Sequence, residues 1–432
     1  MEHILDHFKA ITATPRCSFD AQKMKEYIVD FAKKCGFEVQ TDDAGNVLCS
    51  KGKPKLCLQA HYDMVCIGEV SPIELVQEGT ILKAKNSTLG ADNGMGMALM
   101  FYAMQNHEHL ECLFTADEEV GLIGASQFRI PLRSDYLLNL DSEEEGEICI
   151  GCAGGVDVIA KLSLHVTPLQ EGMKLYEVCA DDFLGGHSGV DIDKNIPSAI
   201  KVLAYELLRH PLELVHFEGG DRRNAIPKSA RAIVATREAL KLFDSRLHVK
   251  PLESPLLTHT LKESSLILGT LSAFAQGVRA WDKTLNIPSV SINMGLVRMH
   301  EGALLMDCAT RAMDDENLAI LANETEAFFK VLGFEAHQES WHGAWKPNAG
   351  LFAQKVQRIM QKAYPDVSMY AIHAGLECGE LIARQPKKIE ALSIGPTIRF
   401  PHSLREECDL DSVRRMHDIL ENIIHEVHYG ID

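Results

Sequence analysis

The sequence lacks the long apolar runs that a membrane span needs. No segment approaches about 18 uninterrupted apolar residues, so we expect neither a transmembrane helix nor a membrane partner. Residues 1–9 (MEHILDHFK) carry charges where a signal peptide needs an apolar stretch. We therefore predict a cytoplasmic protein.

Positive charge is also scarce. Lys and Arg number 43 against 61 Asp and Glu, which gives a net charge of −18. A surface that acidic repels phosphate backbones and anionic lipids, so we expect no nucleic acid among the partners. The same charge would help to concentrate divalent cations. Glycine (31) and proline (16) are close to average, which excludes collagen-like and low-complexity classes.

Cysteine is present but in no metal-binding or disulfide pattern. The chain has twelve cysteines, and in a cytoplasmic protein we expect them to be reduced and mostly buried. Cys149 and Cys152 form a lone Cys-x-x-Cys, whereas a zinc ribbon needs a second pair. A redox pair is an alternative, but the isolation of the motif favours inert thiols.

The 432 residues suggest two or three domains. About the first 150 residues alternate short apolar runs with helical patterns, which predicts an α/β fold with a mainly parallel sheet and helices on its faces. We expect Asp92 or Asn93 to cap one of these helices. The predicted strands are Lys55–Ala60, Leu110–Thr115 and Tyr136–Leu140, and the predicted helices are 20–35 and Asn93–Asn106.

After about residue 170 the pattern changes to that of an α+β domain. We divide the chain into an α/β domain at 1–170, an inserted α+β domain at 171–343, and a return of the α/β domain at 344–432. The insert is predicted to hold helices at 195–209 and 314–332 and strands at 230–236, 289–296 and 303–310; the last part, helices near 350–364 and at 411–427 and a strand at Ile389–Ile394.

Histidine and acidic residues recur just past the predicted strands, where open α/β sheets build their sites. Imidazole with carboxylate suits zinc, manganese or cobalt, whereas magnesium and calcium prefer all-oxygen sites. Each residue alone has an ordinary explanation, such as a helix cap or an exposed charge. Their recurrence in one domain predicts a metal site with the candidate ligands His61, Asp92, Glu119, Asp141 and His402.

Two further acids lie beside these candidate ligands. Asp63 is placed to accept the other imidazole proton of His61 and so to orient that ring; a simple turn residue is an equal alternative. If Glu119 binds metal, Glu118 points elsewhere and can act as a general base. The alternative is an acidic helix N-terminus. We expect residues 143–145, three glutamates, to be mostly solvated.

Two other motifs fail on inspection. Residues 186–190 (GHSGV) would need a glycine at 190 to be a nucleophile elbow. Residues 94–99 (GMGMAL) lack the third glycine of a dinucleotide-binding fingerprint. A serine hydrolase and a dehydrogenase are therefore weak interpretations.

Taken together, the motifs resemble a known family, the co-catalytic di-zinc exopeptidases. Within it the chain is similar to the bacterial aminoacyl-histidine dipeptidases, which cleave Xaa-His dipeptides such as carnosine. The resemblance runs from the first predicted helix to the last. It is carried by AHYDMV (60–65), LGADNGMG (89–96), TADEEVG (115–121), NLDSEEEGE (139–147), GCAGG (151–155), GGHSG (185–189), AIHAGLECG (371–379) and GPTIRFPHS (395–403).

The resemblance implies an α/β catalytic domain, an inserted lid and two divalent ions, with zinc expected and cobalt or manganese as alternatives. It implies that Asp92 bridges the ions, that His61 and Asp141 complete one site, and that Glu119 and His402 complete the other. Glu118 would be the base that activates the water, and Asp63 would orient His61.

The resemblance also implies substrate-binding residues in the insert. His187 would stabilise the oxyanion, and an imidazolium suits developing negative charge. Asn224 and Arg311 would hold the terminal carboxylate or the carbonyl of the substrate, and Arg suits a bidentate carboxylate contact. The backbone near Gly375 would line the pocket. For Asn224 and Arg311, turn or surface roles are nearly equal alternatives.

The predicted function is thus metal-dependent hydrolysis of Xaa-His and related dipeptides. One alternative is a related amidohydrolase of N-acyl amino acids or a tripeptidase. Another is a non-catalytic metal- or peptide-binding protein, against which the intact Glu118 argues, because a pure binder needs no base beside the metal. The sequence leaves open which metal is bound and whether two chains pair into a homodimer.

Overall fold

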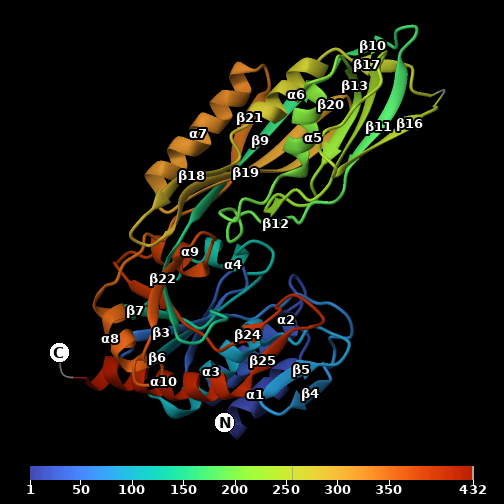
Figure 1. The fold of residues 1–432 in the computed structure, drawn as a ribbon. Coiled ribbons are helices and arrows are strands. Elements are labelled where there is room, and N and C mark those ends of the chain that lie inside the picture. Colours follow the sequence, from blue (N-terminus) through green and yellow to red (C-terminus); the bar gives the residue numbers. More distant parts are fainter. Residues whose placement is uncertain (255, 431–432) are drawn as a thin grey trace. The chain divides into compact units, whose positions relative to one another are not determined.

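The computed structural model describes residues 1–254 and 256–430 and divides into two compact units (Figure 1). The second unit begins at Ala153 and not at residue 171, because strand β9 (Gly154–Ser163) pairs with β20 (Ala303–Ala312) and β21 (Glu335–His342) in its sheet. Unit 1 comprises Met1–Cys152, Trp345–Ala371 and Leu376–Asp432, and unit 2 comprises Ala153–Ala344 and Ile372–Gly375.

Unit 1 is built on a sheet in the order β1-β2-β6-β3-β7-β23-β8-β22. Its four central strands, β6, β3, β7 and β23, run parallel, whereas β1, β2 and β8 pair antiparallel. All residues of β3 and β6 are buried, as expected for parallel strands covered on both faces. The strands are β1 (Glu38–Thr41), β2 (Val47–Lys51), β3 (Leu56–His61), β6 (Leu110–Thr115), β7 (Tyr136–Asn139), β8 (Glu147–Cys152), β22 (Ser368–Ile372) and β23 (Glu390–Ser393).

Helices cover both faces of this sheet (Figure 1). Five of them share one hydrophobic core with the sheet; the spacing of Ile4, Phe8 and Ile11 on the first helix shows the apolar stripe that makes this packing favourable. The other two pack against each other, one of them also against β23. The five are α1 (Glu2–Thr12), α2 (Gln22–Lys34), α3 (Ala91–Asn106), α8 (Leu351–Met360) and α10 (Leu410–Tyr429), and the two are α4 (Ile123–Gln127) and α9 (Glu377–Ala383).

A small antiparallel sheet, in the order β24-β25-β5-β4, completes unit 1. Ile398 pairs with Cys408 and Arg399 with Glu407, so the chain between the first two strands forms a tight loop. That loop carries His402. The strands are β4 (Leu75–Glu78), β5 (Ile81–Ala84), β24 (Ile398–Arg399) and β25 (Glu407–Asp409).

Unit 2 is an α+β unit with a nine-stranded sheet, in the order β16-β11-β15-β13-β19-β20-β9-β21 with β18 paired to β19. Neighbouring strands pair antiparallel, and three helices pack their apolar sides on it. The further elements are α5 (Ala199–Leu208), α6 (Ser264–Ala273), α7 (Asp315–Val331), β11 (Lys174–Ala180), β13 (Glu213–Gly219), β15 (Ala230–Thr236), β16 (Leu247–Leu252), β18 (Gly277–Asp282), β19 (Ile287–His300), and the two-stranded pairs β10 (Val166–Pro168) with β17 (His259–Leu261) and β12 (Gly186–His187) with β14 (Ala225–Ile226).

The predicted helices and strands are present, with ends shifted by a few residues; β6 and β15 match the predicted ranges residue for residue. The predicted cap of α3 is wrong. Asp92 (ψ 111°) and Asn93 (φ −104°) have non-helical backbone, and no side chain caps the helix. The reason is that Asp92 and Asn93 both turn their side chains toward other polar groups of unit 1.

The expectation of twelve reduced cysteines is also wrong for one pair. Cys17 and Cys66 form a disulfide, because the loop after α1 lies against the segment after β3, where Met64 donates to the Arg16 carbonyl. Cys149 and Cys152 are buried thiols that do not belong to this disulfide. Burial raises the pKa of Cys152 to about 12, which agrees with an inert thiol.

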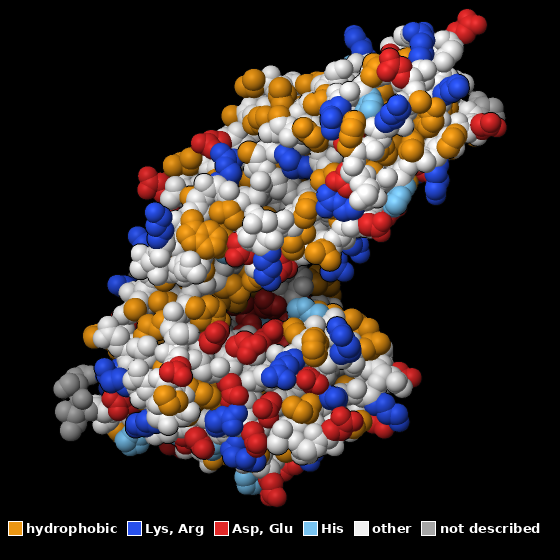
Figure 2. All heavy atoms as spheres, viewed as in Figure 1, with side chains coloured by type: hydrophobic (Ala, Val, Ile, Leu, Met, Phe, Trp, Pro, Cys, Tyr) orange, Lys and Arg blue, Asp and Glu red, His pale blue; other side chains and the backbone are white. Residues whose placement is uncertain are grey.

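Within the described ranges, no helix combines the length and apolar character needed to cross a bilayer. Acidic and basic side chains are interspersed on the visible face (Figure 2).

The three glutamates at 143–145 are less solvated than predicted, since only Glu144 is exposed. Glu145 binds Arg415 through both oxygens at 2.8 Å. Burial raises the pKa of Glu143 to about 8.

Candidate functional site

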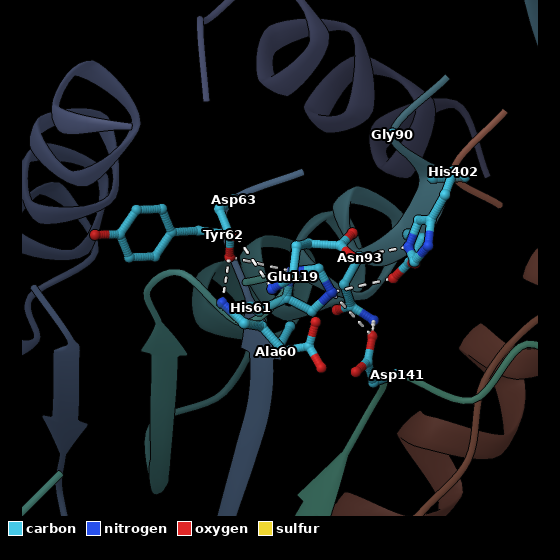
Figure 3. A network of polar contacts seen from close by, with 12 residues as sticks. Ala60, His61, Tyr62, Asp63, Gly90, Asn93, Glu119, Asp141 and His402 are labelled. Carbon is cyan, nitrogen blue, oxygen red and sulfur yellow. Dashed lines mark hydrogen bonds and ion pairs between the residues drawn. The ribbon is translucent and has the colours of Figure 1, made fainter. Parts of the chain in front are cut away.

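The five predicted metal ligands lie together in unit 1. Figure 3 labels four of them, His61, Glu119, Asp141 and His402. His61 is the last residue of β3, and Glu119 and Asp141 lie shortly after β6 and β7. Because these three strands are parallel neighbours, their carboxyl ends meet at one edge of the sheet. Asp92 comes from the segment that opens α3, and His402 from the β24–β25 loop.

Asp92 lies between two histidines from different segments. Its Oδ1 is 3.0 Å from Nε2 of His61, and its Oδ2 is 3.0 Å from Nε2 of His402. Asp141 Oδ1 is 3.3 Å from the same nitrogen of His61, and Glu119 Oε2 is 2.8 Å from that of His402. The five side chains thus form two groups that share Asp92, and within each group the ligand atoms lie within 4.8 Å of one another.

The electrostatics of these groups call for added positive charge. Burial raises the pKa of Asp141 to about 6. Hydrogen bonds that His402 donates to Asp92 and Glu119 raise the pKa of His402 to about 11. Burial opposes a charge on His61, yet Asp141, Asp63 and Asp92 raise its pKa well above the usual value. Carboxylates crowded around imidazole nitrogens are therefore stabilised by any cation between them.

The donor set fits divalent metal ions. Each group offers one imidazole nitrogen and two carboxylates, which suits zinc, manganese or cobalt. Glu119 adds a second indication: its Oε1 is buried and, among the described residues, has no hydrogen-bond partner. An unpartnered buried carboxylate oxygen is costly unless a ligand completes it.

Asp63 is fully buried behind His61. Its Oδ1 lies 3.4 Å from Nδ1 of His61, on the side of the ring opposite to Asp92. It also accepts hydrogen bonds from the Ser18 hydroxyl at 2.7 Å and the Glu118 amide at 3.0 Å. Burial opposes its ionisation, but the contact with His61 and these donors lower its pKa. This geometry favours an orienting role over the turn-residue alternative.

Glu118 is half-buried and is adjacent to the candidate ligands without belonging to either of the two groups above. One of its oxygens lies within 4.8 Å of ligand atoms of His61 and Glu119. Burial, with Asp141, Glu377 and Glu119 nearby, raises its pKa well above the usual value. A carboxyl group in such surroundings is suited to take up and release a proton.

A buried polar network beneath the ligands was not predicted. Gln59 donates to Glu377 Oε2 at 2.5 Å and to Thr115 at 3.0 Å, and accepts from Asn139 at 2.6 Å. Burial raises the pKa of Glu377 to about 7. A signal was present for two members: Gln59 and Asn139 are polar residues in otherwise apolar strands, each two positions before a candidate ligand.

His187, in unit 2, is oriented by its own turn. Its Nδ1 accepts hydrogen bonds from the amides of Gly189 (3.1 Å) and Val190 (3.2 Å), so the ring proton of the neutral form lies on Nε2. Burial, then Arg311, lowers its pKa. The structure therefore favours a neutral N–H donor over the predicted imidazolium.

The other predicted substrate residues also belong to unit 2. Asn224 is exposed, and its carbonyl accepts the amide of Ser188 at 2.8 Å. Arg311 lies on β20 opposite Ser291 of β19. Gly375 follows a histidine that the sequence analysis did not single out.

That histidine, His373, is buried, and its Nε2 lies 2.7 Å from the Ser291 hydroxyl. Burial and the nearby Arg311 lower its pKa to about 3. It is therefore neutral at neutral pH. A single histidine within a glycine-containing segment gives no sequence signal that separates this role from others.

No family model matches the sequence. The chain is 32% identical over 473 residues to the cytosol non-specific dipeptidase of Escherichia coli, covering 98% of this chain and 97% of that protein.

Solved structures of dipeptidases also match almost the whole chain. The aminoacylhistidine dipeptidase of Vibrio alginolyticus matches with a TM-score of 0.83 and 28% identity, covering 98% of this chain and 96% of that one. Human carnosine dipeptidase 1 matches with a TM-score of 0.55 and 12% identity, covering 99% and 97%. At 12% identity, the match to the human protein shows a shared fold alone.

Proposed function

We propose a function from the premise that this chain belongs to the cytosol non-specific dipeptidase family, a group of M20 metallopeptidases. The chain is a metal-dependent hydrolase that cleaves dipeptides. We propose Xaa-His dipeptides of the carnosine type among its substrates. One observation carries the proposal: two groups of candidate ligands share Asp92, with Glu118 beside them.

We propose that unit 1 holds two divalent ions, with zinc expected. His61 and Asp141 would complete one site and Glu119 and His402 the other, with Asp92 between them; the distances from its two oxygens to the two histidines support this division. Two such ions, when bound, polarise a carbonyl and acidify a water. Asp63 would keep Nε2 of His61 directed at its site.

Glu118 would move the proton during hydrolysis. The carboxylate accepts the proton of the attacking water and then delivers it to the leaving amine. Its raised pKa, caused first by burial, supports this exchange, because a carboxyl group with a raised pKa takes up a proton more readily than an ordinary one.

We assign substrate binding to unit 2. His187 would donate its Nε2 proton to the developing oxyanion, which a neutral imidazole can do. Arg311 and Asn224 would hold the terminal carboxylate or the carbonyl, and the backbone near Gly375 would line the pocket. The orientation of His187 by two backbone amides supports its part of this assignment.

The test is a panel of substrates assayed with zinc, cobalt and manganese. We expect free histidine to be released from carnosine-like dipeptides, the activity to disappear on chelation, and elemental analysis to give two ions per chain. Release of acetate from acetylated amino acids without dipeptide cleavage would favour the amidohydrolase alternative. One ion per chain in active enzyme would overturn the two-metal assignment.

We propose that the protein acts in the cytoplasm, as the name of its Escherichia coli relative says of that protein. A disulfide such as Cys17–Cys66 would be an exception in that compartment, where most thiols are reduced. Fractionation of cells tests the location: recovery of the protein in the cytoplasmic fraction supports the proposal, and its absence there would contradict it. Sedimentation of the pure protein decides whether two chains pair.

A further inference from the structure

The backbone segment that carries Asp92 is held from two sides by buried charged side chains. These side chains, Glu406 and Arg16, both bind the backbone of Gly90, which Figure 3 labels. The amide of Gly90 donates to Glu406 at 2.9 Å, and its carbonyl accepts from Arg16. Gly90 has φ +66°, a left-handed conformation that glycine adopts without strain.

Glu406 binds four consecutive amides of this segment. Its Oε2 accepts from Leu89 at 2.8 Å and from Gly90, and its Oε1 accepts from Ala91 at 2.8 Å and Asp92 at 3.3 Å. The side chain is 3% exposed, so water cannot replace these bonds without opening the fold. Because Glu406 lies four positions after His402, it ties the loop of one candidate ligand to that of another.

Arg16 ties in a third segment. It is 2% exposed, and one end of its guanidinium donates to the carbonyls of Asp63 at 2.6 Å and Tyr62 at 3.3 Å, while the other donates to Gly90. All three of these bonds go to backbone carbonyls. Arg16 thus links the backbone after His61 to the backbone before Asp92, in the bidentate manner that only arginine allows.

The glycines of this region make room for that guanidinium. A Cβ built on Gly90 would lie 2.5 Å from Nη2 of Arg16, and one on Gly94 would lie 2.7 Å from it. Both approaches are closer than carbon and nitrogen tolerate. The segment before α3 is therefore shaped to receive Arg16 on one side and Glu406 on the other.

We propose that Arg16 and Glu406 are positioning residues that hold the Asp92 backbone, through Gly90, in the place where its two oxygens face His61 and His402. The proposal rests on the two-metal function above. A carboxylate shared between two ions must be held to within about 0.5 Å. Arg16 and Glu406 supply this by joining the three loops that carry His61, Asp92 and His402, and neither belongs to the groups of candidate ligands.

The experiment compares E406Q and R16M with a matched control, E111Q. Glu111 is also a fully buried glutamate that accepts backbone amides, from Arg133 at 3.1 Å and Ser134 at 2.8 Å, but it lies at the start of β6, at the strand end opposite to Glu119. Its loss should lower stability without moving the candidate ligands.

Each metal-free protein is titrated with Co²⁺, followed by calorimetry and by the visible absorption of the bound ion, and its thermal unfolding is recorded. We expect E406Q and R16M to weaken binding of at least one Co²⁺ by about 10–100-fold, the usual cost of losing a partner behind a ligand. They should lower kcat more than they raise KM. E111Q should lower Tm yet bind Co²⁺ within about 2-fold of wild type.

Two results would overturn the proposal, and a third would overturn the function on which it rests. If E406Q has a lower Tm, as E111Q does, but binds Co²⁺ with wild-type affinity, the role of Glu406 is only structural and the proposal is overturned. If R16M does not fold, R16K takes its place, because lysine keeps the charge but lacks the planar guanidinium. Wild-type Co²⁺ affinity in R16K overturns the proposed role of Arg16. Fewer than two Co²⁺ in wild type would instead contradict the proposed function, before any variant is considered.

Discussion

The candidate sites of the two units differ in how their side chains are held. In unit 1, Asp92 is buried and its backbone amide is bound by Glu406, which lies 314 positions away in the chain. In unit 2, His187 is oriented by the two amides that follow it in its own turn. Crowded carboxylates need support from many segments, whereas one neutral donor needs only a local turn.

This difference predicts that variants of the two units change different measured properties. Changes among the supporting groups of unit 1 should alter metal binding. Changes in unit 2 should alter rate or substrate affinity while the metal content stays the same. Glu118 should be the exception in unit 1, because its loss should lower the rate while the metal content stays the same.

The largest effect is expected for Glu118→Gln. The amide cannot accept a proton from water, so kcat should fall by about 10²–10⁴-fold, the usual range for loss of a general base. Metal content should stay at the wild-type value, because the two groups that share Asp92 do not need Glu118. Elemental analysis and steady-state kinetics measure both, with Glu144→Gln, an exposed neighbour, as the control. Loss of metal would mean that Glu118 and Glu119 exchange roles.

His187→Ala should lower kcat by about 10²–10³-fold, the scale of losing one oxyanion donor. Because the five candidate metal ligands all belong to unit 1, both ions and the thermal stability of unit 1 should be retained. His248→Ala, an exposed histidine of unit 2 paired with Asp182, is the control and should remain active. Full activity of the His187 variant would remove the residue from the chemistry.

Arg311→Ala should act on substrate affinity. A charge-assisted hydrogen bond contributes about 1.5–3 kcal/mol, so KM for dipeptides with a free carboxylate should rise by about 10–100-fold. KM for the amidated dipeptides should change less. Arg311→Lys should recover part of the loss, since it keeps the charge but not the bidentate geometry. Equal losses on free and amidated substrates would contradict the carboxylate role.

The smallest effect concerns His373 and pH. Its folded pKa of about 3 lies below the ordinary 6.5, so between these values the unfolded chain binds a proton that the folded chain does not. Stability of unit 2 should therefore fall as pH drops from 6.5, by up to about 1.4 kcal/mol per pH unit from this group.

His373→Gln tests this dependence, since the glutamine can keep a hydrogen bond to Ser291 without titrating. Denaturant unfolding of both proteins at pH 6.5 and pH 4.5 should show a smaller loss of stability for the variant. Parallel losses in the two proteins would mean that His373 can be protonated without unfolding.

Much of the chemistry was predictable because it lies in short motifs. His61, Glu119 and Asp141 lie at or just after strands whose apolar runs can be recognised in the sequence, so their clustering at one sheet edge could be expected from parallel pairing alone. Asp63 and Glu118 could be found for the same reason, since each lies next to a candidate ligand in the chain. The boundary at Ala153 could not, because β9 belongs to unit 2 only through its pairing with β20 and β21.

The sequence by itself thus determined the α/β and α+β classes, and it supplied the candidate ligands and the proposed general base. Only the tertiary structure decided what holds them. Arg16 and Glu406 lie 74 and 316 positions from Gly90 and follow no periodic pattern, so no local signal marks them. Their roles arise because a buried charge must find partners wherever folding brings backbone amides and carbonyls together.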